Sequence, residues 1–89
     1  MGETQELIDK IKGILQAGFP NAVVELEQAV PSTKVAGLLI CPDFEGVEQI
    51  ERQDLLWNVL SKNLTRPEQL QITAILTLTP EERTVSQER

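Results

Sequence analysis

Residues 44–64, FEGVEQIERQDLLWNVLSKNL, join a turn to a helix with one apolar face, and the other segments are arranged around that helix. Gly46 lets the turn adopt positive φ at little cost. From Arg52 onward, apolar residues recur at helical spacing. These residues are Leu55, Leu56, Val59, Leu60 and Leu64. The stretch therefore predicts a helix that packs on a core and is entered through a glycine turn.

The segment before this stretch predicts a helix followed by two strands. Thr4 is placed to cap a helix that ends near Ala17, where a glycine and a proline follow. Residues 22–28 alternate between apolar and polar, which is typical of a strand with one solvent-facing side. Residues 35–41 are apolar on both faces, which indicates a more central strand. A hairpin between the two strands is the simplest pairing.

The segment after this stretch predicts one more strand and a short last helix. Residues 65–69 are interpreted as a polar connection, and residues 70–78 alternate with their apolar side chains at even-numbered positions. Thr79 then caps a helix that has Pro80 at its first position. We expect residues 84–89 to fray, because this tail carries little apolar surface.

Length and charge limit the class of protein. A chain of 89 residues with 40% hydrophobic content predicts a single domain over residues 1–89, with a core at about residues 5–83. The net charge of -6 disfavours binding to phosphate backbones. The chain shows no signal-peptide pattern, no apolar run long enough for a membrane and no cysteine pair for a disulfide. We therefore expect a cytoplasmic protein without a membrane partner.

The residue types that carry most enzyme chemistry are missing. The chain has no histidine, and its single thiol, Cys41, ends an apolar strand and is interpreted as a core residue. Glu48 and Glu51 are spaced to share a helix face, which we interpret as solvated rather than as a divalent-ion site. No P-loop, CxxC or GxSxG motif occurs. We expect neither enzymatic activity nor a bound metal or cofactor.

Several positions match the pattern of a known family. They are Phe44 and Gly46 of an F-x-G motif, Arg52 of R-H-R, the apolar pair Leu55 and Leu60, and residues 77–81, TLTPE, of T-x-T-P-E. On these motifs the chain resembles the BolA family. The resemblance implies an α+β fold similar to class II KH domains, in the order α-β-β-α-β-α. It implies a three-stranded mixed sheet with helices packed on one face, and a one-turn helix near residues 46–50.

The chain departs from the family pattern at the positions that carry its chemistry. Gln53 follows Arg52 where the family has histidine, and Gln71 stands where the family has a histidine at the start of the last strand. Family members are partners of monothiol glutaredoxins and share an iron–sulfur cluster through that histidine and a Cys or His in the loop between the first two strands. The corresponding loop here, AVPSTK, has neither residue. The resemblance therefore implies a family member without the cluster ligands.

Two functions follow as hypotheses. The first is a non-enzymatic BolA-like protein-interaction or regulatory module, with a monothiol glutaredoxin as a candidate partner. The second is a KH-like nucleic-acid-binding regulator. The only basic residues from which its binding surface could be built are Arg52, Lys62 and Arg66. The residues at positions 46–49, GVEQ, do not form the GxxG loop with which a KH domain clamps a nucleic-acid backbone.

The candidate partner-binding residues are Arg52, Gln53, Trp57 and Gln71. We expect Arg52→Ala and Gln71→Ala to weaken partner binding with little effect on stability, since both positions are predicted to lie on the surface. Trp57 borders the apolar stripe. It is therefore either a core residue that closes the gap between helix and sheet or an exposed anchor of an interface.

Overall fold

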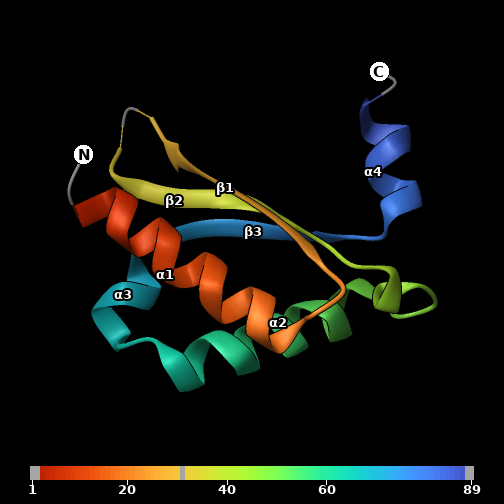
Figure 1. Cartoon of the computed structure of the whole chain (residues 1–89), viewed down its shortest axis with the longest axis horizontal. Coiled ribbons are helices and arrows are strands. Elements are labelled where there is room, and N and C mark those ends of the chain that lie inside the picture. Colours follow the sequence, from red (N-terminus) through yellow and green to blue (C-terminus); the bar gives the residue numbers. More distant parts are fainter. Residues whose placement is uncertain (1–2, 31, 88–89) are drawn as a thin grey trace.

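The computed structural model describes residues 3–30 and 32–87, which form an α+β fold (Figure 1). In chain order the elements are α1 (Glu3–Gly18), β1 (Val23–Ala29), β2 (Lys34–Ile40), the 3-10 turn η1 (Pro42–Phe44), α2 (Gln49–Asn63), α3 (Arg66–Leu70), β3 (Ile72–Leu78) and α4 (Pro80–Gln87). The expected order α-β-β-α-β-α is therefore present, with one additional short helix before the last strand. No helix in the described ranges is long and apolar enough to cross a membrane.

The sheet is mixed, as expected, and its order is β1-β2-β3. β1 pairs antiparallel with β2, and β3 pairs parallel with β2. The central strand carries Val35 and Leu39 into the core. Gly37 is required where β1 and β2 approach each other, because a Cβ there would overlap the carbonyl oxygen of Glu25 and lie 2.9 Å from the Cα of Leu26. The prediction that the second strand is central is confirmed.

Helices α1 and α2 cover one face of the sheet, whereas α4 stands on the other side of it (Figure 1). The core lies between the helix layer and the sheet. Its most deeply buried side chains come from α1, β2, α2 and β3: Ile11, Leu15, Val35, Leu39, Leu56, Leu60 and Ile75. Cys41 belongs to this cluster and is 0% exposed, so its interpretation as a core residue is confirmed. Burial raises the pKa of its thiol.

The buried stripe of α2 differs from the predicted one at two positions. Leu56, Leu60 and Leu64 are buried as expected, but Leu55 is 46% exposed. A helix turns by about 100° per residue, so Leu55 points away from the direction of Leu56. Arg52, one turn before Leu56, takes the inward position instead. The expectation that Leu55 belongs to the core stripe is therefore wrong.

The turn before α2 contains the predicted positive-φ glycine, since Gly46 has φ +80°. The single helical turn, however, lies at Pro42–Phe44 and not at residues 46–50. Pro42 has a fixed φ that suits the first position of a helical turn, and the positive φ at Gly46 prevents helix across that residue. The turn buries Phe44 against Phe19, with ring centroids 5.8 Å apart.

Residues 65–69 are not an irregular connection, because α3 occupies Arg66–Leu70. A capping box starts this helix. The backbone N–H of Glu68 donates to Thr65 Oγ1 at 3.3 Å, and the N–H of Thr65 donates to the Glu68 carboxylate at 2.8 Å. Pro67 adds a residue that favours the first helical turn. The T-x-x-E pattern and the proline were visible in the sequence.

From Ala74 onward, β3 directs its odd-numbered side chains into the core, whereas the alternation in the sequence predicted the even-numbered ones. Thr77 is 1% exposed, whereas Leu76 is 56% exposed. The cause is an irregularity in the pairing with β2, where Val35 pairs with Ile72 but Ala36 pairs with Ala74. The extra residue shifts the alternation by one position from there onward. The even-numbered apolar side chains therefore do not share the buried face.

α4 begins at the predicted cap, Thr79, which forms a capping box with Glu82. The backbone N–H of Thr79 donates to Glu82 Oε1 at 2.9 Å, and the N–H of Glu82 donates to Thr79 Oγ1 at 3.2 Å. The helix extends to Gln87, so the backbone is helical at residues 84–87, where we expected fraying. Residues 88–89 lie outside the described residues, and the expectation of a frayed end stays a prediction.

Candidate functional site

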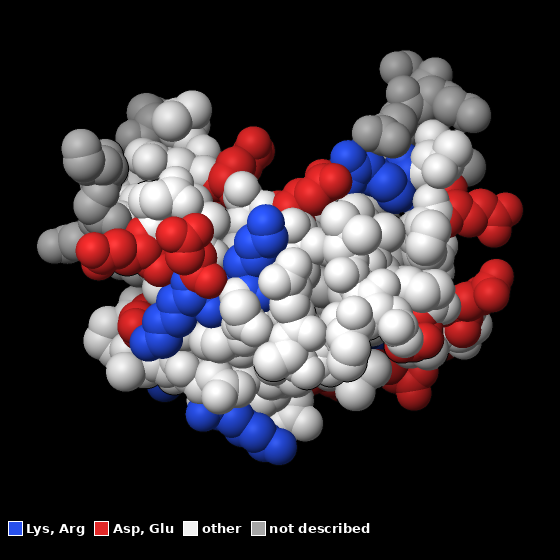
Figure 2. Space-filling view, viewed as in Figure 1, with Lys and Arg blue, Asp and Glu red and all other residues white. Residues whose placement is uncertain are grey.

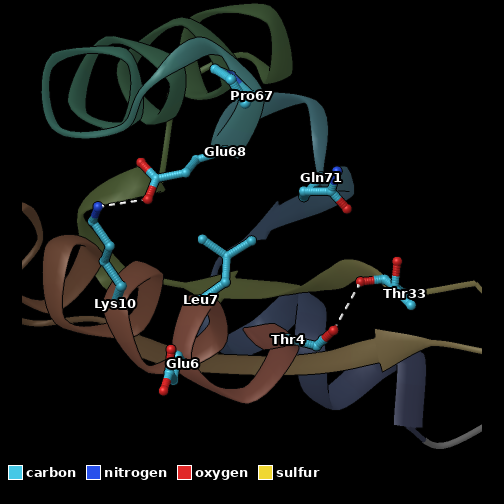
Figure 3. Close-up of a pocket in the computed structure, with 8 residues that line it drawn as sticks. All are labelled: Thr4, Glu6, Leu7, Lys10, Thr33, Pro67, Glu68 and Gln71. Atoms are coloured by element: carbon cyan, nitrogen blue, oxygen red, sulfur yellow. Dashed lines mark hydrogen bonds and ion pairs between the residues drawn. The ribbon is translucent and has the colours of Figure 1, made fainter. Parts of the chain in front are cut away.

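One polar recess lies where α1, α3 and the β1–β2 loop meet, and we call it the α1–α3 pocket (Figure 3). It is lined by Thr4, Glu6, Leu7, Lys10, Thr33, Pro67, Glu68 and Gln71. Figure 3 shows Leu7 reaching from α1 toward Glu68 and Gln71, while Glu6 points away from them. Of the four predicted site residues, only Gln71 lines this pocket.

Two contacts fix the shape of the α1–α3 pocket. Lys10 Nζ lies 2.7 Å from Glu68 Oε2 and joins α1 to α3. The hydrogen bond from Lys10, together with the backbone N–H of Thr65, holds the pKa of the Glu68 carboxyl below its ordinary value. Thr4 Oγ1 donates to the carbonyl oxygen of Thr33 at 3.4 Å and joins α1 to the β1–β2 loop. Elements distant in the sequence therefore hold the pocket together.

Gln71 occupies the junction between α3 and β3. Its backbone carbonyl accepts a 2.7 Å hydrogen bond from the N–H of Val35, which ties it to the start of β2. The side chain is half-buried, and its amide makes no hydrogen bond within residues 3–30 and 32–87. An amide carries both donor and acceptor capacity. Gln71 therefore presents unused hydrogen-bonding groups in the pocket.

The residues of the α1–α3 pocket do not fit an iron–sulfur cluster. Clusters are held by thiolate or imidazole, and the pocket offers amide, hydroxyl, carboxylate and ammonium groups. Cys41 follows the far end of β2, about 23 Å along a seven-residue strand from the pocket end. Across the described ranges, no group of three or more His, Cys, Asp or Glu residues is arranged to hold a metal ion.

Arg52 lies in a second region, at the N-terminal end of α2, and is 5% exposed. Its Nε donates to the carbonyl of Val47 at 2.7 Å, and its Nη1 donates to Thr77 O at 3.2 Å and to Glu82 Oε1 at 2.8 Å. The guanidinium also lies 5.7 Å from the ring centroid of Phe44. The expectation that Arg52 is a surface residue is therefore wrong. Its burial connects α2, β3 and α4.

Gln49 and Gln53 cover the outer edge of β3. Gln49 Nε2 donates to Thr77 O at 3.0 Å, and Gln53 Nε2 donates to Ile75 O at 3.0 Å. These carbonyls point away from β2. Thr77 O also accepts from Arg52, whereas the Ile75 carbonyl would remain unpaired at the edge without Gln53. The Thr77 hydroxyl donates to Gln49 Oε1 at 2.8 Å, which satisfies a buried polar side chain. Gln53 therefore has a structural contact that the sequence did not predict.

Trp57 lies one turn beyond Gln53 on the same side of α2. Its side chain is half-buried and packs against the core cluster. This contact agrees with the interpretation that Trp57 closes the gap between helix and sheet. The four predicted site residues thus fall into two groups, with Gln71 at the start of β3 and the others along α2. Their roles in partner binding stay predictions.

The solved structures that resemble the chain include two BolA-type proteins. A BolA protein homologue from Coxiella burnetii matches with a TM-score of 0.63 and 26% sequence identity, covering 94% of this chain and 99% of the other. A Bol-like protein from Babesia bovis matches with a TM-score of 0.61 and 19% identity, covering 89% and 91%, and this second likeness concerns the fold. No family model matches the chain, and no curated protein sequence does.

The mixed sheet with its layer of helices defines the chain as an α+β protein of the class II KH-like type. Within that class the chain is BolA-like, because it is similar to the BolA homologue over nearly its full length at 26% identity. The chain differs from the family pattern that its sequence resembles in that it contains no histidine.

Proposed function

We propose that the chain is a non-enzymatic BolA-like interaction module with a regulatory role, and that it binds a partner protein at the α1–α3 pocket. The observation that carries this proposal is the half-buried Gln71 amide, which makes no hydrogen bond within the described ranges. It stands at the position of the family's cluster ligand, beside the β1–β2 loop. The same surface therefore remains available to a partner after the loss of the ligand.

A monothiol glutaredoxin is the first partner to test, because BolA relatives are known partners of these proteins. In this proposal binding rests on the Gln71 amide, the Lys10–Glu68 pair and the apolar side chain of Leu7. Any iron–sulfur cluster stays on the glutaredoxin, because the pocket supplies no thiolate or imidazole. We place the partnership in the cytoplasm, where the unpaired Cys41 needs no oxidising environment.

The alternative, a KH-like nucleic-acid-binding regulator, has no observation in its favour. Arg52, one of the three basic residues on which it depends, is buried and paired with Glu82 at 2.8 Å. Lys62 and Arg66 alone give little attraction to a phosphate backbone in a chain of net charge -6. On the face that Figure 2 shows, basic side chains are scattered among acidic ones and form no continuous strip.

Affinity capture with matched variants tests the pocket. Wild type, Gln71→Ala and Lys10→Ala are immobilised, and the glutaredoxin that each retains is quantified by titration. We expect each of the two variants to bind about tenfold more weakly, which corresponds to the loss of one polar contact to a partner, about 1.4 kcal/mol.

The controls change the same residue types elsewhere on α1. Gln16→Ala and Lys12→Ala remove exposed side chains that do not line the pocket. They should bind as the wild type does. Equal binding by all five proteins, once circular dichroism shows that they are folded, would place the partner surface elsewhere and overturn the proposal.

A further inference from the structure

The two outer edges of the sheet differ in how they are covered. At the edge of β3, side chains of α2 take the place of a neighbouring strand. Gln49 and Arg52 donate to Thr77 O, and Gln53 donates to Ile75 O. Such cover prevents another strand from pairing with that edge. The edge of β3 is therefore closed.

The outer edge of β1 is open. Within the described ranges, no side chain or backbone group outside the β1–β2 ladder forms a hydrogen bond to the backbone of residues 23–27. In an antiparallel pair, alternate residues of an edge strand direct their N–H and C=O groups away from the partner strand. Over residues 23–27, these groups form a free ladder about 17 Å long.

A recess of ≈ 220 Å³ runs beside this open edge. Its lining comes from α1 and β1 alone: Thr4, Gln5, Ile8, Leu26, Glu27 and Gln28. No residue of β2 lines it, so it opens on the outer side of β1. Ile8 and Leu26 are half-buried and give it an apolar floor. A strand added to β1 would direct every second side chain toward this floor.

The charged side chains on the face of β1 opposite to Leu26 determine which type of strand can bind to this edge. Glu25 and Glu27 are exposed and project from the face opposite to Val24 and Leu26. Arg83 of α4 lies 2.6 Å from Glu25, whereas Glu27 has no ion pair among the described residues. An added strand with lysine or arginine at alternate positions would place a cation beside Glu27.

A second copy of β1 does not suit this edge. Consider an antiparallel β1–β1 pair in which the helices of both copies lie on the same side of the joined sheet. Such a pair can be centred on residue 25, 26 or 27. In each of these registers, Glu25 or Glu27 of one copy lies opposite a glutamate of the other copy. Like charges directly opposite each other destabilise such pairs. The acidic edge therefore opposes self-association while it attracts a basic strand.

We propose that the open edge of β1 binds an extended basic segment of a partner protein by strand addition. The segment alternates apolar side chains, which enter the recess over Ile8 and Leu26, with lysine or arginine side chains beside Glu25 and Glu27. Backbone hydrogen bonds supply the affinity, and the alternation supplies the specificity. This surface is separate from Gln71 and adds a second contact to the module.

An end-capped heptapeptide in which lysine and valine alternate serves as the probe. It is titrated into the isotopically labelled protein, and amide chemical shifts and hydrogen exchange are followed by NMR. We expect saturable shifts in residues 23–29 and slower exchange of the outward-facing β1 amides. The same peptide with glutamate in place of lysine should not bind. A version that is N-methylated at every backbone nitrogen keeps its lysine ammonium groups but cannot donate backbone hydrogen bonds, and it should not bind either.

Protein variants separate this edge from the rest of the surface. Glu27→Lys should weaken binding of the lysine peptide about tenfold, while Glu51→Lys, the same charge change on an exposed position of α2, should change it much less. Gln71→Ala should bind the peptide as the wild type does, which keeps this test independent of the α1–α3 pocket. Absent binding, equal binding of the N-methylated peptide, equal effects of the two lysine variants, or loss of binding in Gln71→Ala would each overturn the proposal.

Discussion

At the scale of single residues, Arg52 shows how a charged side chain becomes part of a small core. Its guanidinium is removed from water but keeps hydrogen bonds to two backbone carbonyls and to the Glu82 carboxylate. Truncating Arg52 would remove these hydrogen bonds together and leave the Val47 carbonyl without its side-chain donor, whereas the Glu82 side chain, which is 45% exposed, would be solvated. The burial of Arg52 is not visible in the sequence, because it depends on Thr77 and Glu82, which follow far along the chain.

Arg52→Ala should therefore lower the free energy of unfolding by about 3 kcal/mol, contrary to the small effect expected for a surface residue. Urea unfolding followed by circular dichroism measures the change. Lys62→Ala removes an exposed cation from the same helix and should stay within about 0.5 kcal/mol of wild type. Equal losses in both variants would show that the Arg52 contacts contribute nothing.

Substitution by alanine should have opposite effects on stability at two glycines. Gly37→Ala should destabilise by at least about 2 kcal/mol, because the new Cβ would overlap the backbone of β1. Gly13→Ala should stabilise by about 1 kcal/mol, because alanine favours a helix interior and nothing lies within 4 Å of the new Cβ. Thermal unfolding of both variants measures this difference. Destabilisation by Gly13→Ala would contradict the open packing at that position of α1.

At the scale of elements, periodicity predicted most helices and strands, and the exceptions have local causes. The positions of α1, β1, β2, α2, β3 and α4 follow from hydrophobic spacing and caps. The buried face of β3 does not, because the irregularity between Ile72 and Ala74 arises from pairing with β2. The short helix α3 was missed although Thr65 and Glu68 form its capping box. The resemblance located Gln71 at the start of β3, whereas no pattern predicted Lys10 and Thr33 beside it.

The attachment of α4 should depend on pH. Arg52, followed by the backbone N–H of Thr79, holds the pKa of the Glu82 carboxyl below its ordinary value of 4.5. A pKa that is lowered in the folded state contributes stability above the unfolded value, and this contribution is lost as pH falls through the folded value. The ionised Glu82 should therefore stabilise the fold at neutral pH and lose this effect progressively below about pH 4.5.

Thermal unfolding of wild type and Glu82→Gln across this pH range measures the contribution. The variant should have the lower melting temperature at pH 7, and the difference should shrink as pH falls below 4.5. Glu51→Gln, which changes an exposed carboxylate without an ion pair among the described residues, should follow the wild type. A difference between Glu82→Gln and wild type that stays constant from neutral to acidic pH would contradict the role of the charged pair.

At the scale of the whole molecule, the acidic charge and the two polar surfaces favour protein partners over nucleic acids. The α1–α3 pocket and the open edge of β1 lie on different sides of the N-terminal half of α1, and Thr4 lines both recesses. In the two proposals taken together, one partner places a basic strand at the acidic edge of β1 and also contacts the Gln71 amide. Neither surface carries the row of lysine and arginine residues that a phosphate backbone requires.

Binding to random single- or double-stranded oligonucleotides should accordingly be undetectable at physiological salt. Fluorescence anisotropy at several salt concentrations measures it. Micromolar affinity with a steep dependence on salt would show that basic groups form a phosphate-binding surface after all.

In our proposal, this BolA-like protein binds its partner without contributing a ligand to an iron–sulfur cluster. Visible circular dichroism of a cluster-loaded monothiol glutaredoxin, recorded anaerobically while this protein is added, tests it most directly, with complex formation followed in parallel by size-exclusion chromatography. We expect a complex to form and the visible spectrum of the cluster to stay unchanged, because Gln71 and the β1–β2 loop offer no thiolate or imidazole. A new spectrum characteristic of mixed ligation would contradict it.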